Sequence, residues 1–499
     1  MPIVDPVMPM KILPTRLLYP ILKPILKALA YGTVGAVLVL LIVFVLYLDG
    51  RPDLSLWHTV DLDQEFTEDS QVTTFEEYLA LEERLFTQLD ERVYGADTDR
   101  ERRLIARYDR GSLSDPGRWK PNWNRSFELD AQSPEAGVLL LHGMSDSPYS
   151  LRTLGQTLNR RGFSVLGLRL PGHGTAPAGL VEVRWPDMAA AVRLAVRHLK
   201  QRVGDRPVYI AGYSNGAALA VHYALSALED ERLPGVKGLV LVSPAIGVTP
   251  AAAFAVWQAR LGHLLGLEKL AWNSILPEYD PFKYNSFAVN AGDQVYRLTR
   301  EIQELIGELG EAGKLGGFPP VLAFQSVVDA TVSTPALVEG LFERLPPGGH
   351  ELVLFDINRA AEIEPIMKAG VVDTVALLRD PDRTFTLSVL SNRDIHSRRV
   401  VVYSEQPGGA EITESDPGLE WPEHIYSLAH VALPFPPTDP VYGGRPGEVG
   451  PGIHLGDMAL RGERGVLRVP ASELLRLRWN PFYYYLESRA LEFIGLDVL

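Results

Sequence analysis

Residues Pro207–Val221 read PVYIAGYSNGAALAV. The apolar, β-branched beginning of this stretch is typical of a buried strand, whereas its alanine-rich end favours a helix. Between them Ser214 is flanked by Gly212 and Gly216. Glycine is needed on both sides because a Cβ would collide where the strand and the helix nearly touch. The stretch therefore predicts a G-x-S-x-G turn that holds the hydroxyl of Ser214 in an exposed and strained position.

Strands and helices alternate on both sides of this turn. Such an alternation predicts right-handed crossovers and a mostly parallel, doubly wound α/β sheet that is covered on both faces. Ligands of such sheets bind beyond the carboxyl ends of the strands. The expected strands are 137–141, 163–170, 207–211, 237–242, 320–325 and 351–356, and the expected helices are 150–161, 186–203 and 335–345.

A serine hydroxyl becomes a nucleophile when a histidine takes its proton and a carboxylate orients that histidine. On this topology the acid follows a later strand and the histidine comes after the acid. We favour Asp329, in the loop after strand 320–325, over Asp356, which ends the next strand. The preferred base is His430, with His396 as the alternative. The long gap before His430 requires the intervening chain to loop out and return.

The tetrahedral intermediate of acyl transfer needs backbone N–H donors directed at its oxyanion. Asn215 follows the serine directly and offers one donor, and Met144, in the loop after strand 137–141, is the best candidate for the other. We interpret the neighbouring His142 as a structural residue of that loop. The sequence has no metal-ligand spacing and no glycine-rich phosphate loop, so neither a metal nor a cofactor is expected.

Four segments carry a resemblance to a known family: LLLHGMSDSP at 139–148, LPGHGT at 170–175, GYSNG at 212–216 and SVVDATVS at 326–333. Together they resemble the α/β-hydrolase superfamily, and most closely its monoacylglycerol lipases and carboxylesterases. The resemblance covers about residues 137–345. It implies the α/β-hydrolase fold and a serine esterase or lipase with Ser214, Asp329 and His430 as its triad and Met144 and Asn215 as oxyanion donors.

The N-terminal region contains an uncharged apolar stretch at 29–48 that is long enough to cross a bilayer as a helix. Lysine and arginine precede it and acidic residues follow it, which predicts a cytoplasmic segment 1–28 and an extracytoplasmic remainder. Proline residues within 12–27 argue against one continuous helix there. We favour an uncleaved signal anchor over a cleaved signal peptide, because the apolar region is long and no A-x-A-like site follows.

The expected hydrolase domain at 135–499 follows a stem and contains two insertions. An acidic stem at 49–134 contains an amphipathic helix at 75–94 and an edge strand near Trp119, Trp123 and Phe127. A cap insertion at 247–317 is rich in aromatic residues, and a second insertion at 357–423 contains two strand-like runs. A final helix is expected at 471–494.

The composition of the chain excludes some classes of function. The 499-residue chain carries a net charge of −14, which makes a nucleic-acid partner improbable, and it has no cysteine to supply a disulfide or a thiolate. We expect a membrane-anchored serine hydrolase that acts on carboxylic esters, with a small-molecule or lipid ester as substrate. The alternatives are a thioesterase or acyltransferase on the same triad, or a non-catalytic scaffold with the hydrolase fold.

Overall fold

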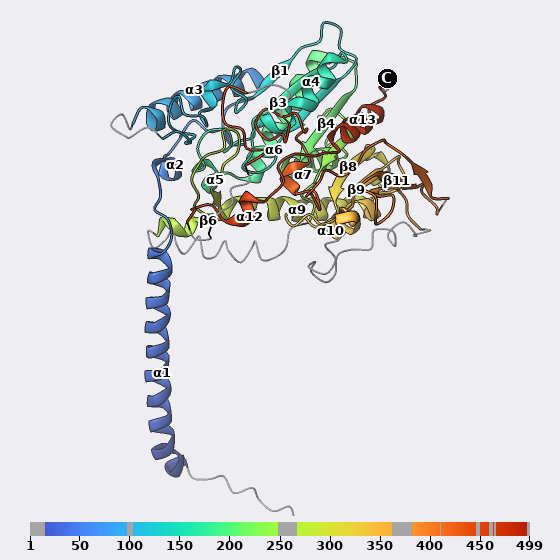
Figure 1. Ribbon diagram of the computed structural model, residues 1–499. Helices are drawn as coiled ribbons and strands as arrows, with labels where there is room; N and C mark the ends of the chain where they lie inside the picture. Colours follow the sequence, from blue (N-terminus) through green and yellow to red (C-terminus); the bar gives the residue numbers. More distant parts are fainter. Residues whose placement is uncertain are drawn as a thin grey trace, which may run out of the picture. The chain divides into compact units, whose positions relative to one another are not determined.

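The computed structural model describes residues 15–96, 103–247, 267–361, 382–409, 411–445, 450–458, 463 and 466–496. The chain divides into two compact units, Met1–Asp53 and Leu54–Leu499 (Figure 1). The first contains one helix, α1 (Thr15–Asp49), whose part Lys27–Asp49 is long and apolar enough to cross a membrane by length and composition. A signal sequence has the same properties.

The backbone of α1 is helical through Pro20 and Pro24, so the expectation that proline interrupts a helix in this region is wrong. Each proline removes one N–H donor, but its φ is already close to the helical value. The surrounding leucine and isoleucine residues favour the helical state, and the helix continues on both sides.

The second unit is built on one ten-stranded sheet in the order β1-β3-β2-β4-β5-β8-β9-β10-β11-β12. The neighbours from β3 to β10 pair in parallel, whereas β1, β11 and β12 pair antiparallel at the edges. The strands are β1 (Phe127–Leu129), β2 (Gly137–Leu141), β3 (Ser164–Leu168), β4 (Val208–Tyr213), β5 (Gly238–Val242), β8 (Val321–Ser326), β9 (Glu351–Phe355), β10 (Thr386–Asn392), β11 (Val400–Glu405) and β12 (Thr413–Ser415). This is the α/β-hydrolase type of sheet that the sequence predicts.

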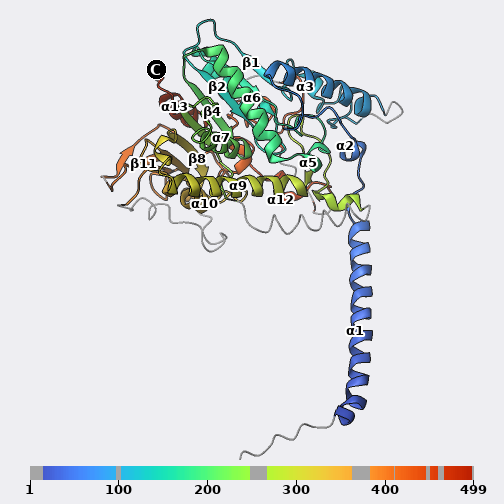
Figure 2. The same cartoon turned by 180° about the vertical axis from the view of Figure 1, so that it is seen from behind.

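Helices cover both faces of this sheet. In β2, Leu139 and Leu141 point into the core beneath α6, α7 and α9, whereas Val138 and Leu140 point into the core beneath α4 and α13. This alternation explains why the strand is apolar throughout. Figure 2 shows α6, α7 and α9 beside one another. The helices are α2 (Leu56–Thr59), α3 (Phe75–Leu89), α4 (Arg152–Arg160), α5 (Gly179–Glu182), α6 (Trp185–Val203), α7 (Asn215–Ser226), α9 (Val289–Glu311), α10 (Thr334–Gly340), α12 (Ala471–Leu474) and α13 (Tyr483–Phe493).

The stem is not separate from the hydrolase domain, because residues from Leu54 onward belong to the same compact unit. In α3, Thr74 and Glu77 form the capping box, and Tyr78 donates a hydrogen bond to the carbonyl of Arg169 at 2.6 Å. Trp119 and Trp123 precede the edge strand, which begins at Phe127 and pairs with β3.

The described strands of the second insertion belong to the same sheet. Its first strand, β10, pairs in parallel with β9, and β11 and β12 extend the sheet beyond it. The run TLSVLSN in β10 is buried at six of seven positions, as in a core strand. The sequence predicts this run in the insertion and not in the core; residues 362–381, which come before it, lie outside the described part of the chain.

The cap is smaller than expected. Residues 289–311 form α9, which packs on α6 and α7 as the helix that connects β5 to β8. Its residues Leu298, Ile302, Ile306 and Leu309 are buried at helical spacing. Of the remaining cap, residues 248–266 lie outside the described part, and a small hairpin of β6 (Trp272–Ser274) and β7 (Phe287–Ala288) is described.

The expected final helix is two helices, α12 and α13, so this prediction is wrong in its length. Pro481 lies between them, and the residue before a proline is disfavoured in helical conformation. Asn480 forms a turn before the second helix, which begins at Tyr483, because its side chain accepts a hydrogen bond from the N–H of Phe482 at 2.9 Å.

Candidate active site

Ser214 lies on the turn between β4 and α7 with φ 53° and ψ −116°. This positive φ is strained for a residue with a side chain. A Cβ on Gly212 would lie 2.6 Å from the backbone nitrogen of Ala217, and one on Gly216 would lie 2.2 Å from the carbonyl oxygen of Leu141. Both glycines are therefore required by the close approach of strand, turn and helix, as the sequence predicts.

The structure brings Ser214, His430 and Asp329 together. Ser214 Oγ lies 3.1 Å from His430 Nε2, and His430 Nδ1 lies 2.7 Å from Asp329 Oδ2. A carboxylate can only accept, so Nδ1 carries the hydrogen and leaves Nε2 free to accept from the serine. The three side chains form one hydrogen-bonded chain in the order that activation of a serine requires.

Asp329 is held as a carboxylate by its surroundings. Burial alone would raise its pKa, but His430 and the N–H groups of Val332 and Thr331 outweigh burial and keep that pKa below its usual range. These two N–H groups donate to Oδ1 at 3.0 and 2.8 Å, which leaves Oδ2 for the histidine. The loop after β8 thus fixes both the charge and the direction of the carboxyl group.

His430 is positioned by the sheet although it comes far later in the chain. It opens a short 3₁₀ turn, His430–Ala432, and is 5% exposed. Ser326, at the end of β8, donates a hydrogen bond to the carbonyl of Leu428 at 3.0 Å, and the Tyr213 hydroxyl lies 3.4 Å from the His430 carbonyl. The strand ends that carry the acid and the serine therefore also hold the loop of the histidine.

The alternative residues lie in different environments. His396 is exposed in the turn between β10 and β11 and does not line the cavity that contains Ser214. Asp356 is buried at the end of β9, where Arg359 donates to its two oxygens at 2.9 and 3.0 Å and Ser391 donates at 2.6 Å. The geometry thus favours His430 and Asp329 as the partners of Ser214.

The loop after β2 lies directly against the serine turn. A Cβ on Gly143 would lie 3.0 Å from the ring of Tyr213 and 3.2 Å from Ser214 Cβ, so a larger residue here would require these neighbours to shift. In the described part of the chain the backbone N–H groups of Met144 and Asn215 donate to no protein acceptor. Both N–H groups are therefore available for an oxyanion.

His142 holds this loop in place through hydrogen bonds. The N–H of Leu170 donates to His142 Nε2 at 3.0 Å, so Nδ1 carries the hydrogen and donates to the Gly143 carbonyl at 2.8 Å. Burial lowers the pKa of His142 well below its usual value, with His173 adding to the decrease. Its neutral imidazole connects the loops that follow β2 and β3, in agreement with a structural role.

A cavity of about 610 Å³ opens onto Ser214 and His430. Part of its wall is apolar or aromatic and includes Met144, Leu276, Phe287 and Val295. Another part is charged and consists of Asp146, Asp280, Lys283, Glu473, Arg476 and Arg478. Sequence reasoning missed these charged residues: Asp146 lies in the segment 139–148 but was given no role there, and Arg476 and Arg478 fall in an expected helix.

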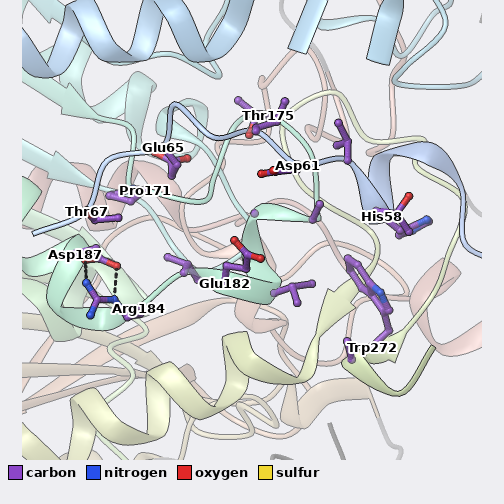
Figure 3. A pocket seen from close by; sticks show the side chains of 18 of the residues that line it. His58, Asp61, Glu65, Thr67, Pro171, Thr175, Glu182, Arg184, Asp187 and Trp272 are labelled. Atoms are coloured by element: carbon purple, nitrogen blue, oxygen red, sulfur yellow. Dashed lines mark hydrogen bonds and ion pairs between the residues drawn. The ribbon is translucent and has the colours of Figure 1, made fainter. Parts of the chain in front are cut away.

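A second cavity, of about 460 Å³, shares no lining residue with the first. Residues of the stem, including Asp61 and Glu65, form one side of it (Figure 3). Glu65 pairs with Arg169 at 2.8 Å, and Asp187 pairs with Arg184 at 2.8 Å, as the dashed lines of Figure 3 mark for the latter pair. His58, which lines this cavity, lies with its Nε2 2.9 Å from the hydroxyl of Ser286. Within the described residues, no group of three or more His, Asp or Glu could hold a metal ion.

Comparison with known proteins finds similarities over part of this chain. Residues 132–355 match the family model described as Hydrolase_4, serine aminopeptidase, S33. The chain is 31% identical over 123 residues to a thermostable monoacylglycerol lipase from Bacillus sp. (strain H-257), covering 25% of this chain and 46% of that protein. It is 26% identical over 171 residues to phospholipase YtpA of Bacillus subtilis (strain 168), covering 34% and 57%. It thus spans about half the length of these relatives.

Among solved structures, a monoacylglycerol lipase from Paleococcus ferrophilus matches with a TM-score of 0.35 and 18% identity over 46% of this chain and 88% of that one. A structure from work on the metagenome-derived lipolytic enzymes LipS and LipT matches with a TM-score of 0.35 and 23% identity over 47% and 87%.

Proposed function

We propose that this chain, which has the α/β-hydrolase type of sheet and matches the serine aminopeptidase S33 family model over residues 132–355, hydrolyses carboxylic esters with Ser214 as nucleophile. One observation carries the proposal: the hydrogen-bonded chain from Ser214 through His430 to Asp329, at 3.1 and 2.7 Å, faces a cavity large enough for an ester. Its relatives are named as a monoacylglycerol lipase and a phospholipase, which supports a lipid ester as the substrate.

The reaction proceeds through an acyl-enzyme. Ser214 Oγ attacks the ester carbonyl while His430 Nε2 takes the serine proton, and Asp329 stabilises the resulting imidazolium. The N–H groups of Met144 and Asn215 bind the oxyanion, and each such donor is worth about 3 kcal/mol. The intermediate collapses as His430 returns the proton to the departing alcohol. Water, activated by the same histidine, then releases the carboxylic acid and restores Ser214.

The apolar helix supports a location at a membrane. We propose that residues 29–48, within the apolar helix part Lys27–Asp49, are an uncleaved anchor, with residues 1–28 in the cytoplasm and the hydrolase unit outside it. The basic residues before the helix and the acidic residues after it favour this orientation. Protease protection of the hydrolase unit in right-side-out and inverted membrane vesicles distinguishes this orientation from its opposite. A signal peptide would instead leave a mature chain that lacks the helix.

The test is labelling of the detergent-solubilised full chain with a fluorophosphonate probe. We expect wild type and His396→Ala to be labelled, and Ser214→Ala and His430→Ala to lose labelling. Absence of labelling in the folded wild type would favour the scaffold alternative. Labelling together with turnover of acyl thioesters, but not of oxygen esters, would favour the thioesterase alternative.

A further inference from the structure

Asp146 presents a carboxyl group to the Ser214 cavity without a hydrogen-bond partner in the described part of the chain. The residue is 5% exposed, and its side chain lines the cavity. It lies two residues after Met144, in the loop that approaches Ser214. Burying a carboxyl group without a hydrogen-bond partner costs free energy, so such a group indicates a ligand or a functional role.

Lys283 contributes an ammonium group to the same cavity. Its loop is attached to the loop of Asp146, because the N–H of Tyr284 donates to the carbonyl of Ser145 at 2.8 Å. Asp280 accepts the backbone N–H of Lys283 at 3.1 Å and thereby fixes the turn. Within the described residues, Lys283 Nζ has neither an ion pair nor a side-chain hydrogen bond. Its charge is therefore available to a ligand.

Two guanidinium groups add to the positive charge of this wall. Arg476 donates to the hydroxyl of Thr331 at 3.0 Å, and its nearest carboxylate, Glu473, is 3.9 Å away. Arg478 lies 3.2 Å from the hydroxyl of Tyr279. Both arginines thus contact neutral hydroxyls, and neither is tightly paired with an acid.

The charge of Asp146 changes near neutral pH. Burial raises the pKa of its carboxyl to about 7, Lys283 opposes the rise and Asp280 adds to it. The other titratable groups near it are the hydroxyls of Tyr213 and Tyr442, which stay neutral because burial raises their pKa values well above the usual one. When Asp146 is protonated, it no longer offsets the charge of Lys283.

We propose that Lys283 binds an anionic oxygen group, a phosphate or a carboxylate, in the alcohol part of the ester, and that the protonated form of Asp146 favours this binding. The inference rests on the proposed function. The apolar wall with Phe287 and Val295 suits the acyl chain, which leaves the charged wall for the alcohol. Lys283 is then a specificity-determining residue and Asp146 a positioning residue for that anionic group.

The test compares three oleoyl esters that differ only in the alcohol: 1-oleoylglycerol, 1-oleoylglycerol 3-phosphate and oleoyl glycolate. The readout is the ratio of kcat/KM for each anionic ester to that for oleoylglycerol, measured on the full chain in neutral detergent. We expect Lys283→Gln to lower the ratio about tenfold, since a hydrogen bond to a charged group is lost. Lys283→Arg should preserve it, and Lys314→Gln, which removes an exposed lysine outside the cavity, should not change it. The two anionic esters separate phosphate from carboxylate recognition.

The role of Asp146 is tested by pH, with oleoyl glycolate as the anionic ester because its carboxylate stays ionised. In wild type the ratio should fall as pH rises through about 7, because deprotonated Asp146 offsets Lys283. In Asp146→Asn the ratio should stay high and lose this dependence. Any effect of pH that is common to both esters cancels in the ratio.

An unchanged ratio in Lys283→Gln, with oleoylglycerol still hydrolysed, would overturn this inference and leave the proposed function intact. If no ester is hydrolysed by folded wild type, the proposed function itself fails. A chain that prefers oleoylglycerol in every variant would identify the charged wall as a site for neutral hydroxyl groups instead.

Discussion

Glu82→Ala tests whether the stem is an integral part of the hydrolase unit. Glu82 is 4% exposed on α3 and lies 3.1 Å from the guanidinium of Arg169, whose side chain is 1% exposed. It also accepts hydrogen bonds from the N–H and hydroxyl of Ser126 at 3.0 and 2.8 Å. The substitution leaves a buried charge and a buried N–H with fewer partners.

Breaking a buried ion pair costs about 3–5 kcal/mol. Arg169 keeps a second carboxylate, Glu65, at 2.8 Å, so we expect the lower end of this range, about 3 kcal/mol. The matched control is Glu83→Ala, the next residue of the same helix, whose exposed pair with Arg125 is worth about 0–1 kcal/mol. Both changes place alanine at a helix position, so helix propensity contributes equally.

The assay is urea unfolding of the full chain in non-ionic detergent, followed by tryptophan fluorescence, with the midpoint and the slope compared between the two variants. We expect Glu82→Ala to unfold at a clearly lower urea concentration than Glu83→Ala. Free energies of unfolding that are equal within about 0.5 kcal/mol would show that α3 does not depend on Arg169 and would refute the reasoning from burial.

Four further substitutions separate catalytic from structural roles. Asp329→Asn should lower kcat by about 10⁴ with little change in folding, because the amide favours the wrong tautomer of His430; a decrease below tenfold would argue against the proposed acid. Gly216→Ala should prevent a native turn, because its Cβ would lie 2.2 Å from a backbone oxygen. The control is Gly307→Ala in α9, whose Cβ would have no neighbour closer than 3.9 Å. We expect this control to raise the stability of the protein by up to about 1 kcal/mol, and thermal melts of both variants measure the difference. Asp356→Ala should lower the melting temperature but retain fluorophosphonate labelling. Loss of labelling in a folded protein would indicate that Asp356, and not Asp329, is the acid.

The sequence predicts the centre of the sheet well, because its strands are short, apolar and bounded by turn residues. The run GVLLL of β2 is found as a strand with the predicted bounds, and Gly212, Ser214 and Gly216 lie on the predicted turn. Such features depend on neighbours in the chain, so local pattern is sufficient to find them. The grouping of Ser214 with His430 and Asp329 followed from strand order, which local pattern also supplies.

The edges of the fold depend on contacts between distant segments and were harder to predict. Whether TLSVLSN forms a core strand is decided by its pairing with β9, and whether 289–311 belongs to a cap or to the core is decided by its packing on α7. In the same way, nothing near Lys283 indicates a place in the Ser214 cavity. It lies there because Tyr284, one residue later, is bound to Ser145, about 140 positions earlier in the chain.

The stem has a specific connection to the candidate site through Arg169. Glu65 and Glu82, both from the stem, bind its guanidinium, which also donates to the carbonyl of His173 at 3.0 Å. The next residue, Leu170, donates its N–H to His142, and His142 in turn fixes the loop of the Met144 donor. A stem that only linked the hydrolase unit to a membrane would not need buried ion pairs at this position. We therefore expect its loss to disturb the oxyanion loop before it disturbs the hydrogen-bonded chain of Ser214, His430 and Asp329, whose contacts come from β4, β8 and the loop after β12.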